Sequence, residues 1–135
     1  MSTKGGKKFK ISTSEGAFDL EINLFIGSPN PEKSRRKLVR NTLIDTGSDF
    51  TIIPLNIARN LNLIPTGRSV DISTFDESVV KVEFYAAKIV IDELLEDIIE
   101  VGVSDFRPLI GMNLLIRWIT IINGPDKTFE ISLAG

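Results

Sequence analysis

One short acidic motif is the clearest candidate for chemistry in this sequence. Asp45, Thr46 and Gly47 lie between two apolar runs, residues 43–44 and 50–53. A carboxylate in such surroundings can act as a general acid or base, and we expect the hydroxyls of Thr46 and Ser48 to lie within reach of it. The glycine permits a tight turn and the close approach of a ligand to the backbone. The simpler alternative is an Asx turn, in which the Asp45 side chain only accepts hydrogen bonds from backbone amides.

Residue types that the chain lacks narrow the chemistry further. The sequence has no His and no Cys. This excludes a Ser-His-Asp triad, a Cys nucleophile, a disulfide framework and the usual zinc sites. We therefore expect no metal and no cofactor, and acid–base chemistry near neutral pH that depends on carboxylates, Lys or Tyr. The acidic stretch at 92–100 alternates with apolar pairs, which favours a solvated face over a cation site.

Size and composition describe an ordinary globular chain. It has 135 residues, of which 42% are hydrophobic and 25% charged, with a formal net charge of −2. These values predict a single domain over 1–135 with a small core, preceded by a loose tail at 1–6. A nucleic-acid partner is not expected without a basic excess, nor a membrane without a long apolar run. The N-terminus has no signal-peptide pattern, so we expect a cytoplasmic protein.

Short apolar segments separated by turn residues predict an all-β fold with one or two short helices. The helices are expected at 55–61 and 113–117, and Trp118 is expected to anchor the core. Residues 27–40 read as a polar loop, whose basic cluster at 33–37 is either solvated or a phosphate- or partner-binding patch. The expected strands are residues 8–12, 17–26, 43–45, 50–53, 70–73, 79–91, 94–103, 109–111, 118–122 and 128–133, the last two as a hairpin.

Two short motifs resemble those of retropepsins, and they occur in the same order along the chain. Residues 43–48 are similar to the active-site loop of aspartic peptidases, which reads apolar-apolar-Asp-Thr/Ser-Gly-Ser/Ala. Residues 108–115 are similar to the two-apolar-plus-glycine motif that precedes a short helix in retropepsins, and Gly111 matches the glycine that packs behind their active-site loop. Residues 80–91 stand where that family has the strand leaving its flap. The resemblance covers about 18–122 and implies a retropepsin-like fold, a small closed β-barrel with a flap hairpin.

The resemblance also implies a mechanism and a partner. Two aspartates held close share a proton and together activate a water. Since the chain has one Asp-Thr-Gly, the second aspartate would come from a symmetry mate. The implied protein is a homodimeric aspartic endopeptidase that cleaves extended peptides or proteins. Its catalytic residues would be Asp45, Thr46 and Gly47. Its substrate-binding residues would be Ser48, Asp49, Ile72, Ser73, Thr74, Phe75 and Ile110.

The sequence also departs from the viral pattern of this family. Met112 stands where viral enzymes have an arginine paired to the carboxylate that Asp49 matches, so this pairing is lost unless Arg107 or Arg117 replaces that arginine. The expected flap tip, 73–78, is not glycine-rich. One alternative is a non-catalytic dimerisation or peptide-binding module that kept the fold. Another is an unrelated sugar- or nucleotide-binding β-barrel.

Overall fold

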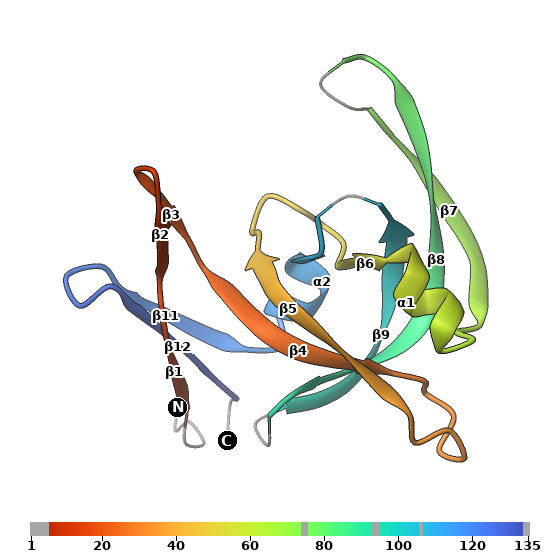
Figure 1. Cartoon of the computed structure of the whole chain (residues 1–135), viewed down its shortest axis with the longest axis horizontal. Coiled ribbons are helices and arrows are strands. Elements are labelled where there is room, and N and C mark those ends of the chain that lie inside the picture. Colours follow the sequence, from red (N-terminus) through yellow and green to blue (C-terminus); the bar gives the residue numbers. More distant parts are fainter. Residues whose placement is uncertain (1–5, 74–75, 93–94, 106, 134–135) are drawn as a thin grey trace.

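The computed structural model describes residues 6–73, 76–92, 95–105 and 107–133 (Figure 1). Strands hold 59% of the described residues and helices 8%, so the prediction of a mostly β chain with short helices is confirmed. The helices are α1 (Leu55–Asn60) and α2 (Met112–Leu115). The strands are β1 (Lys7–Lys10), β2 (Ser12–Ser14), β3 (Ala17–Asp19), β4 (Glu21–Gly27), β5 (Arg36–Ile44), β6 (Ile52–Pro54), β7 (Pro65–Ser73), β8 (Val79–Ile91), β9 (Leu95–Ser104), β10 (Leu109–Ile110), β11 (Ile119–Asn123) and β12 (Thr128–Ser132).

The strands form one large sheet and two small ones. The large sheet has seven strands in the order β4-β5-β10-β6-β9-β8-β7, and β4 also pairs with β8. The terminal sheet, β1-β12-β11, joins the two ends of the described chain (Figure 1). The third sheet is the hairpin β2–β3. Two pairings in the large sheet are parallel, β10 with β5 and β6 with β9.

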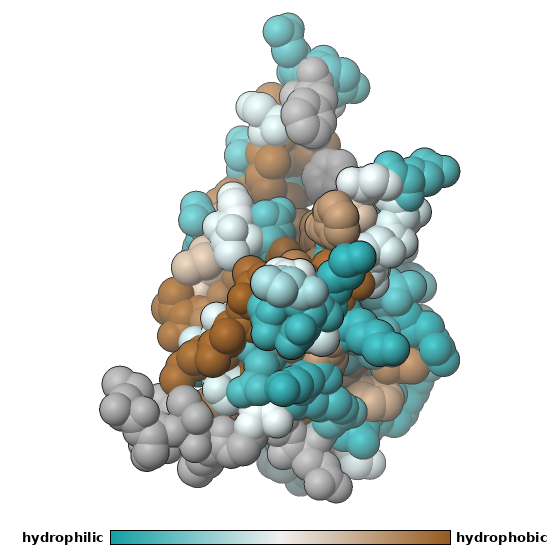
Figure 2. Space-filling view, turned by 90° about the vertical axis from the view of Figure 1, so that its left-hand side faces the viewer, coloured by the Kyte–Doolittle hydropathy of each residue, from teal (hydrophilic) through white to brown (hydrophobic). Residues whose placement is uncertain are grey.

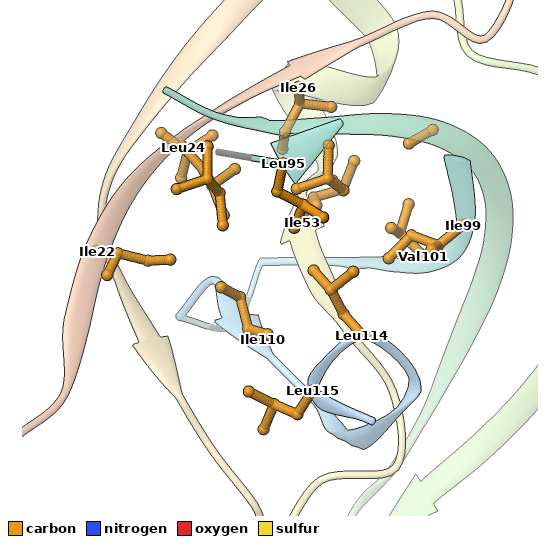
Figure 3. Close-up of a cluster of buried hydrophobic side chains, with 14 of the residues drawn as sticks. Ile22, Leu24, Ile26, Ile53, Leu95, Ile99, Val101, Ile110, Leu114 and Leu115 are labelled. Carbon is orange, nitrogen blue, oxygen red and sulfur yellow. The ribbon is translucent and has the colours of Figure 1, made fainter. Parts of the chain in front are cut away.

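Alternating apolar residues fill the space that the large sheet encloses. In β4, Ile22, Leu24 and Ile26 are buried, as a period of two requires of one sheet face. They meet Ile110 and Leu114 in the same core (Figure 3). Each such side chain contributes about 1.5–3 kcal/mol by leaving water. Trp118 is buried in this core, which confirms its expected role as an anchor.

Several boundaries differ from the sequence-based expectation. Residues 27–40 are not one loop, because β5 begins at Arg36 and buries Val39. The strands expected at 8–12 and 17–26 are each divided in two, as β1 with β2 and β3 with β4. The strand expected over 94–103 is confirmed as β9, and Leu94 lies outside the described residues. Most of the tail expected at 1–6 lies outside them too.

Strands β7 and β8 extend well beyond the rest of the large sheet. Pairing of β8 with β9 stops at Glu83, opposite Val103. Residues 79–82 therefore pair only with β7, and the hairpin projects from the sheet (Figure 1). We call this projection, residues 69–73 and 79–82, the arm. No helix in the described part of the chain is long and apolar enough to cross a membrane.

Candidate active site

Asp45 directly follows the last residue of β5, at a point where the sheet is tied together by a short central strand. Strand β10 lies between β5 and β6, parallel to the first and antiparallel to the second. The backbone N–H of Asp45 donates to the carbonyl of Ile110 at 2.9 Å. The Asp45 backbone is thus fixed by β10, while its side chain is only partly buried.

The turn after Asp45 uses one oxygen of its carboxylate. The N–H of Gly47 donates to Asp45 Oδ1 at 2.9 Å, and the N–H of Ser48 donates to the Asp45 carbonyl at 3.2 Å. The first bond is the Asx-turn contact of the simpler alternative, so it is present whether or not the site is catalytic. Within the described chain, no group donates to Oδ2. Thr46 and Gly47 are exposed beside it.

Gly111 supports from behind the loop between β5 and β6, residues 45–51, which we call the active-site loop. A Cβ atom at Gly111 would lie 2.2 Å from the carbonyl oxygen of Phe50 and 2.4 Å from its carbonyl carbon. Only a glycine permits this approach between the two backbones. The N–H of the next residue, Met112, donates to the Ser48 carbonyl at 2.7 Å. The start of α2 therefore holds the loop in place.

Two residues that were not expected from the sequence, Thr51 and Asn113, brace the loop. The buried Thr51 hydroxyl donates to Asn113 Oδ1 at 2.8 Å and accepts from the N–H of Gly111 at 3.2 Å. Asn113 also donates from its backbone N–H to the Asp49 carbonyl at 3.2 Å. Thr51 could have been noticed in the sequence because it lies within the apolar run expected as a strand at 50–53. A hydroxyl buried in such a strand needs a hydrogen-bond partner.

One expectation about the loop's polar residues is wrong, and a replacement pairing that the sequence left open is absent among the described residues. The Ser48 hydroxyl does not reach the Asp45 carboxylate, because it donates to the Phe50 carbonyl at 2.8 Å. Neither arginine replaces the missing partner of Asp49: Arg107 pairs with Glu21, and Arg117 with Asp97 at 2.8 Å. Asp49 is exposed and has no ion pair with any described residue.

The remaining predicted substrate contacts are placed unevenly. Ile72 is partly buried on the arm, against a small cluster that includes Ile52, Val82 and Phe84. Ser73 is exposed at the end of β7, and Thr74 and Phe75 lie outside the described residues. Ile110 is fully buried, so in this structure it supports the loop from beneath instead of facing a ligand.

The acidic stretch expected as a solvated face carries ion pairs along β9. Glu96 pairs with Lys88 at 3.2 Å, and Glu100 pairs with Arg68 at 2.9 Å. Asp97 is the partner of Arg117 noted above. Among the described residues, no group of three or more acidic side chains could hold a metal ion.

Comparisons with known proteins point to one fold. No family model matches the chain, and no curated protein matches it in sequence. Among solved structures, it is similar to the crystal structure of a retropepsin-like aspartic protease from Rickettsia conorii. The TM-score is 0.58 at 20% identity, over 98% of this chain and 95% of that one. The fold is retropepsin-like. At this level of identity the similarity shows the fold alone, and activity must be argued from the site.

Proposed function

We propose that this chain is one subunit of a homodimeric aspartic endopeptidase. The observation that carries the proposal is the position of Asp45. It is partly exposed at the end of β5, on a loop that β10 and Gly111 hold from behind, in a retropepsin-like fold. Because the chain has one Asp-Thr-Gly, a second copy must supply the other carboxylate.

In the proposed reaction, the two Asp45 carboxylates share one proton because two close negative charges repel. The ionised carboxylate takes a proton from a water, whose oxygen attacks the carbonyl carbon of the peptide. The protonated carboxylate donates to the carbonyl oxygen. The tetrahedral product then collapses, the C–N bond breaks, and the leaving nitrogen takes a proton. No covalent enzyme intermediate forms.

The terminal sheet offers a surface for the second copy. Strand β11 pairs with β12 on one side, and no described strand pairs with its other edge. Ile121 and Ile122 on this strand are 54% and 60% exposed, and nearby Ile116 is 72% exposed. An open edge strand with exposed apolar side chains tends to pair with another strand. Figure 2 views the side where this sheet lies and shows a band of apolar surface there.

Backbone connections also favour this surface. The edge strand follows α2 within a few residues, and the start of α2 is hydrogen-bonded to the active-site loop. A two-fold axis beside β11 would therefore also bring two Asp45 loops toward each other. The Thr46 hydroxyl has no partner within the described chain, which leaves it free to bond across that axis.

The Asx-turn bond of Asp45 also suits a non-catalytic dimerisation or peptide-binding module with the same fold. Asp45→Asn separates the two possibilities, because it is nearly isosteric. For a peptidase, we expect cleavage of an unstructured protein to fall at least 10²-fold while the dimer persists. The matched control is Asp105→Asn, an exposed carboxylate outside the loop, which should keep full activity. Wild-type protein that binds but never cleaves unstructured proteins would instead favour the module.

The sharing of one active site between two subunits can be tested separately. Specific activity should fall on dilution as the dimer dissociates, and sedimentation over the same series should show monomer appearing in parallel. Adding an equal amount of Asp45→Asn protein should leave about a quarter of the dimers with two aspartates, since subunits pair at random. Activity that stays proportional to the wild-type protein added, or that persists in a monomeric sample, would contradict the shared site.

A further inference from the structure

A bulge marks the point where the arm leaves the large sheet. On β7 and β8, Pro65 pairs with Tyr85 and Ser69 pairs with Glu83, so three residues of β7 face a single residue of β8. Gly67, in the middle of the three, has φ +88°. Bulges bend a strand and increase its twist. The direction of the arm is therefore set at residues 66–68.

Arg68, in this bulge, packs on two aromatic rings. Its guanidinium carbon lies 4.6 Å from the ring centre of Phe84 and 5.1 Å from that of Phe50. The two rings meet edge to face, with centres 4.9 Å apart. Phe84 belongs to the strand opposite the bulge, whereas Phe50 directly follows Asp49 in the active-site loop. The arginine thus covers the contact between the arm's base and that loop.

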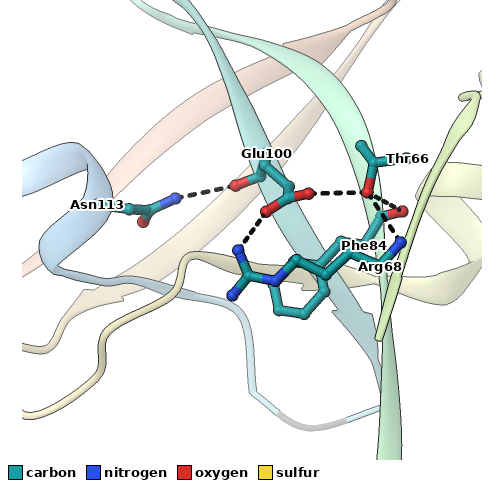
Figure 4. Close-up of polar contacts among 5 residues, drawn as sticks. All are labelled: Thr66, Arg68, Phe84, Glu100 and Asn113. Atoms are coloured by element: carbon teal, nitrogen blue, oxygen red, sulfur yellow. Dashed lines mark hydrogen bonds and ion pairs between the residues drawn. The ribbon is translucent and has the colours of Figure 1, made fainter. Parts of the chain in front are cut away.

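Glu100 provides a second connection (Figure 4). Its Oε1 accepts from Arg68 Nη1 at 2.9 Å, and its Oε2 accepts from the Thr66 hydroxyl at 2.8 Å. Both oxygens are therefore used by the bulge. The Glu100 carbonyl accepts from Asn113 Nδ2 at 2.9 Å, and Asn113 braces the active-site loop through Thr51.

We propose that Arg68 is a positioning residue that fixes the arm over the active-site loop. This inference rests on the proposed function and on the expectation that this hairpin is the flap that covers a bound peptide. Arg68 contacts no residue of the Asp-Thr-Gly motif, so it acts on where the arm lies and not on the chemical step. Loss of Arg68 removes the contact of the bulge with Phe50 and one of its two bonds to Glu100, and the arm then spends less time in the position that binds substrate.

Steady-state kinetics test this role at a protein concentration that keeps the dimer assembled. We expect Arg68→Ala to raise KM by up to about tenfold, the ratio that a half-exposed ion pair and a cation–π contact together supply. The kcat should stay within about twofold, since the interaction is not confined to the transition state. Arg68→Lys keeps the positive charge but loses the planar guanidinium group, so its KM should lie between those of the wild type and Arg68→Ala.

A matched control removes another cross-strand ion pair. Lys88→Ala breaks the Lys88–Glu96 pair, which joins β8 and β9 away from the arm. Its KM and kcat should equal those of the wild type. A tenfold drop in kcat at unchanged KM in Arg68→Ala, or an equal rise of KM in Lys88→Ala, overturns the positioning role.

Hydrogen exchange tests the inference without any need for peptidase activity. In Arg68→Ala, amides of residues 69–73 and 79–82 should exchange about tenfold faster, while those of 95–101 in β9 keep their wild-type rates. Acceleration throughout β9, or none in the arm, overturns the proposal. If wild-type protein shows no cleavage, the proposed function fails, and the exchange pattern alone then decides whether Arg68 holds the arm.

Discussion

Replacing Gly111 with alanine should damage this protein more than the same change at its other glycines. The added Cβ would lie 2.2 Å from the Phe50 carbonyl oxygen, where ordinary contacts begin at 3.4 Å. The Phe50 backbone must therefore recede by about 1.2 Å, because no side-chain rotation can relieve a clash with backbone. We expect a loss of about 3 kcal/mol or more, at or above the upper end for overpacking.

Two other glycines give a graded comparison. At Gly102, a Cβ would meet the ends of the Ile52 and Val82 side chains at 2.8 Å, so Gly102→Ala should cost about 1–3 kcal/mol. At Gly124, nothing lies within 4 Å, and Gly124→Ala should stay within about 0.5 kcal/mol of wild type. Urea unfolding measures all three, at one protein concentration because dimerisation would add to the apparent stability.

The same displacement should reach the active-site loop. Movement of Phe50 shifts residues bonded to Gly111 and α2, and a misplacement of about 1 Å can reduce catalysis by about 10²-fold. Folded Gly111→Ala protein should therefore cleave poorly even where urea unfolding shows it to be native. The reasoning is refuted if Gly111→Ala loses no more stability than Gly102→Ala, or if it keeps wild-type cleavage.

Three further changes test buried polar groups, each by thermal or urea unfolding. Thr42→Val should be neutral or stabilising by up to about 1 kcal/mol, because the Thr42 hydroxyl is buried without a partner in the described structure; a clear loss would reveal a partner. Thr51→Val, in contrast, should cost about 1–3 kcal/mol, since it leaves the Gly111 N–H and Asn113 Oδ1 unpaired. Trp118→Phe should cost less than the roughly 3–5 kcal/mol typical of Trp→Ala, because the ring that remains fills most of the site and the buried indole N–H has no described partner to lose.

The parts of the fold that the sequence predicted depend on local signals. The helices at 55–61 and 113–117 and the terminal hairpin follow from apolar spacing and turn residues near one another in the chain. The support of the loop by Gly111 was inferred because a glycine after two apolar residues matches a known motif. These features required no knowledge of distant contacts.

The missed features depend on pairings between distant residues. Cations at 36, 37 and 40 made the first half of β5 look like a loop, because in that half of the strand only Val39 is fully buried and the other residues are exposed or partly exposed. The bond of Thr66 to Glu100 joins positions 34 residues apart, and neither residue type is unusual for an exposed strand. The Ser48 bond was misjudged because two acceptors, the Asp45 carboxylate and the Phe50 carbonyl, both lie within three residues of Ser48 in the sequence.

The terminal sheet has a consequence for the order of events during synthesis. Phe9 of β1 stacks on Phe129 of β12 at 5.1 Å between ring centres. Strand β1 therefore cannot pair until β12, 120 residues later in the sequence, has been synthesised. Such distant pairings form late in folding because they close a long loop of chain. Strand β11 gains its neighbour β12 at the same late stage. A peptidase assembled through this edge would remain inactive on the ribosome and in its partly folded forms, and would not digest the nascent chains around it.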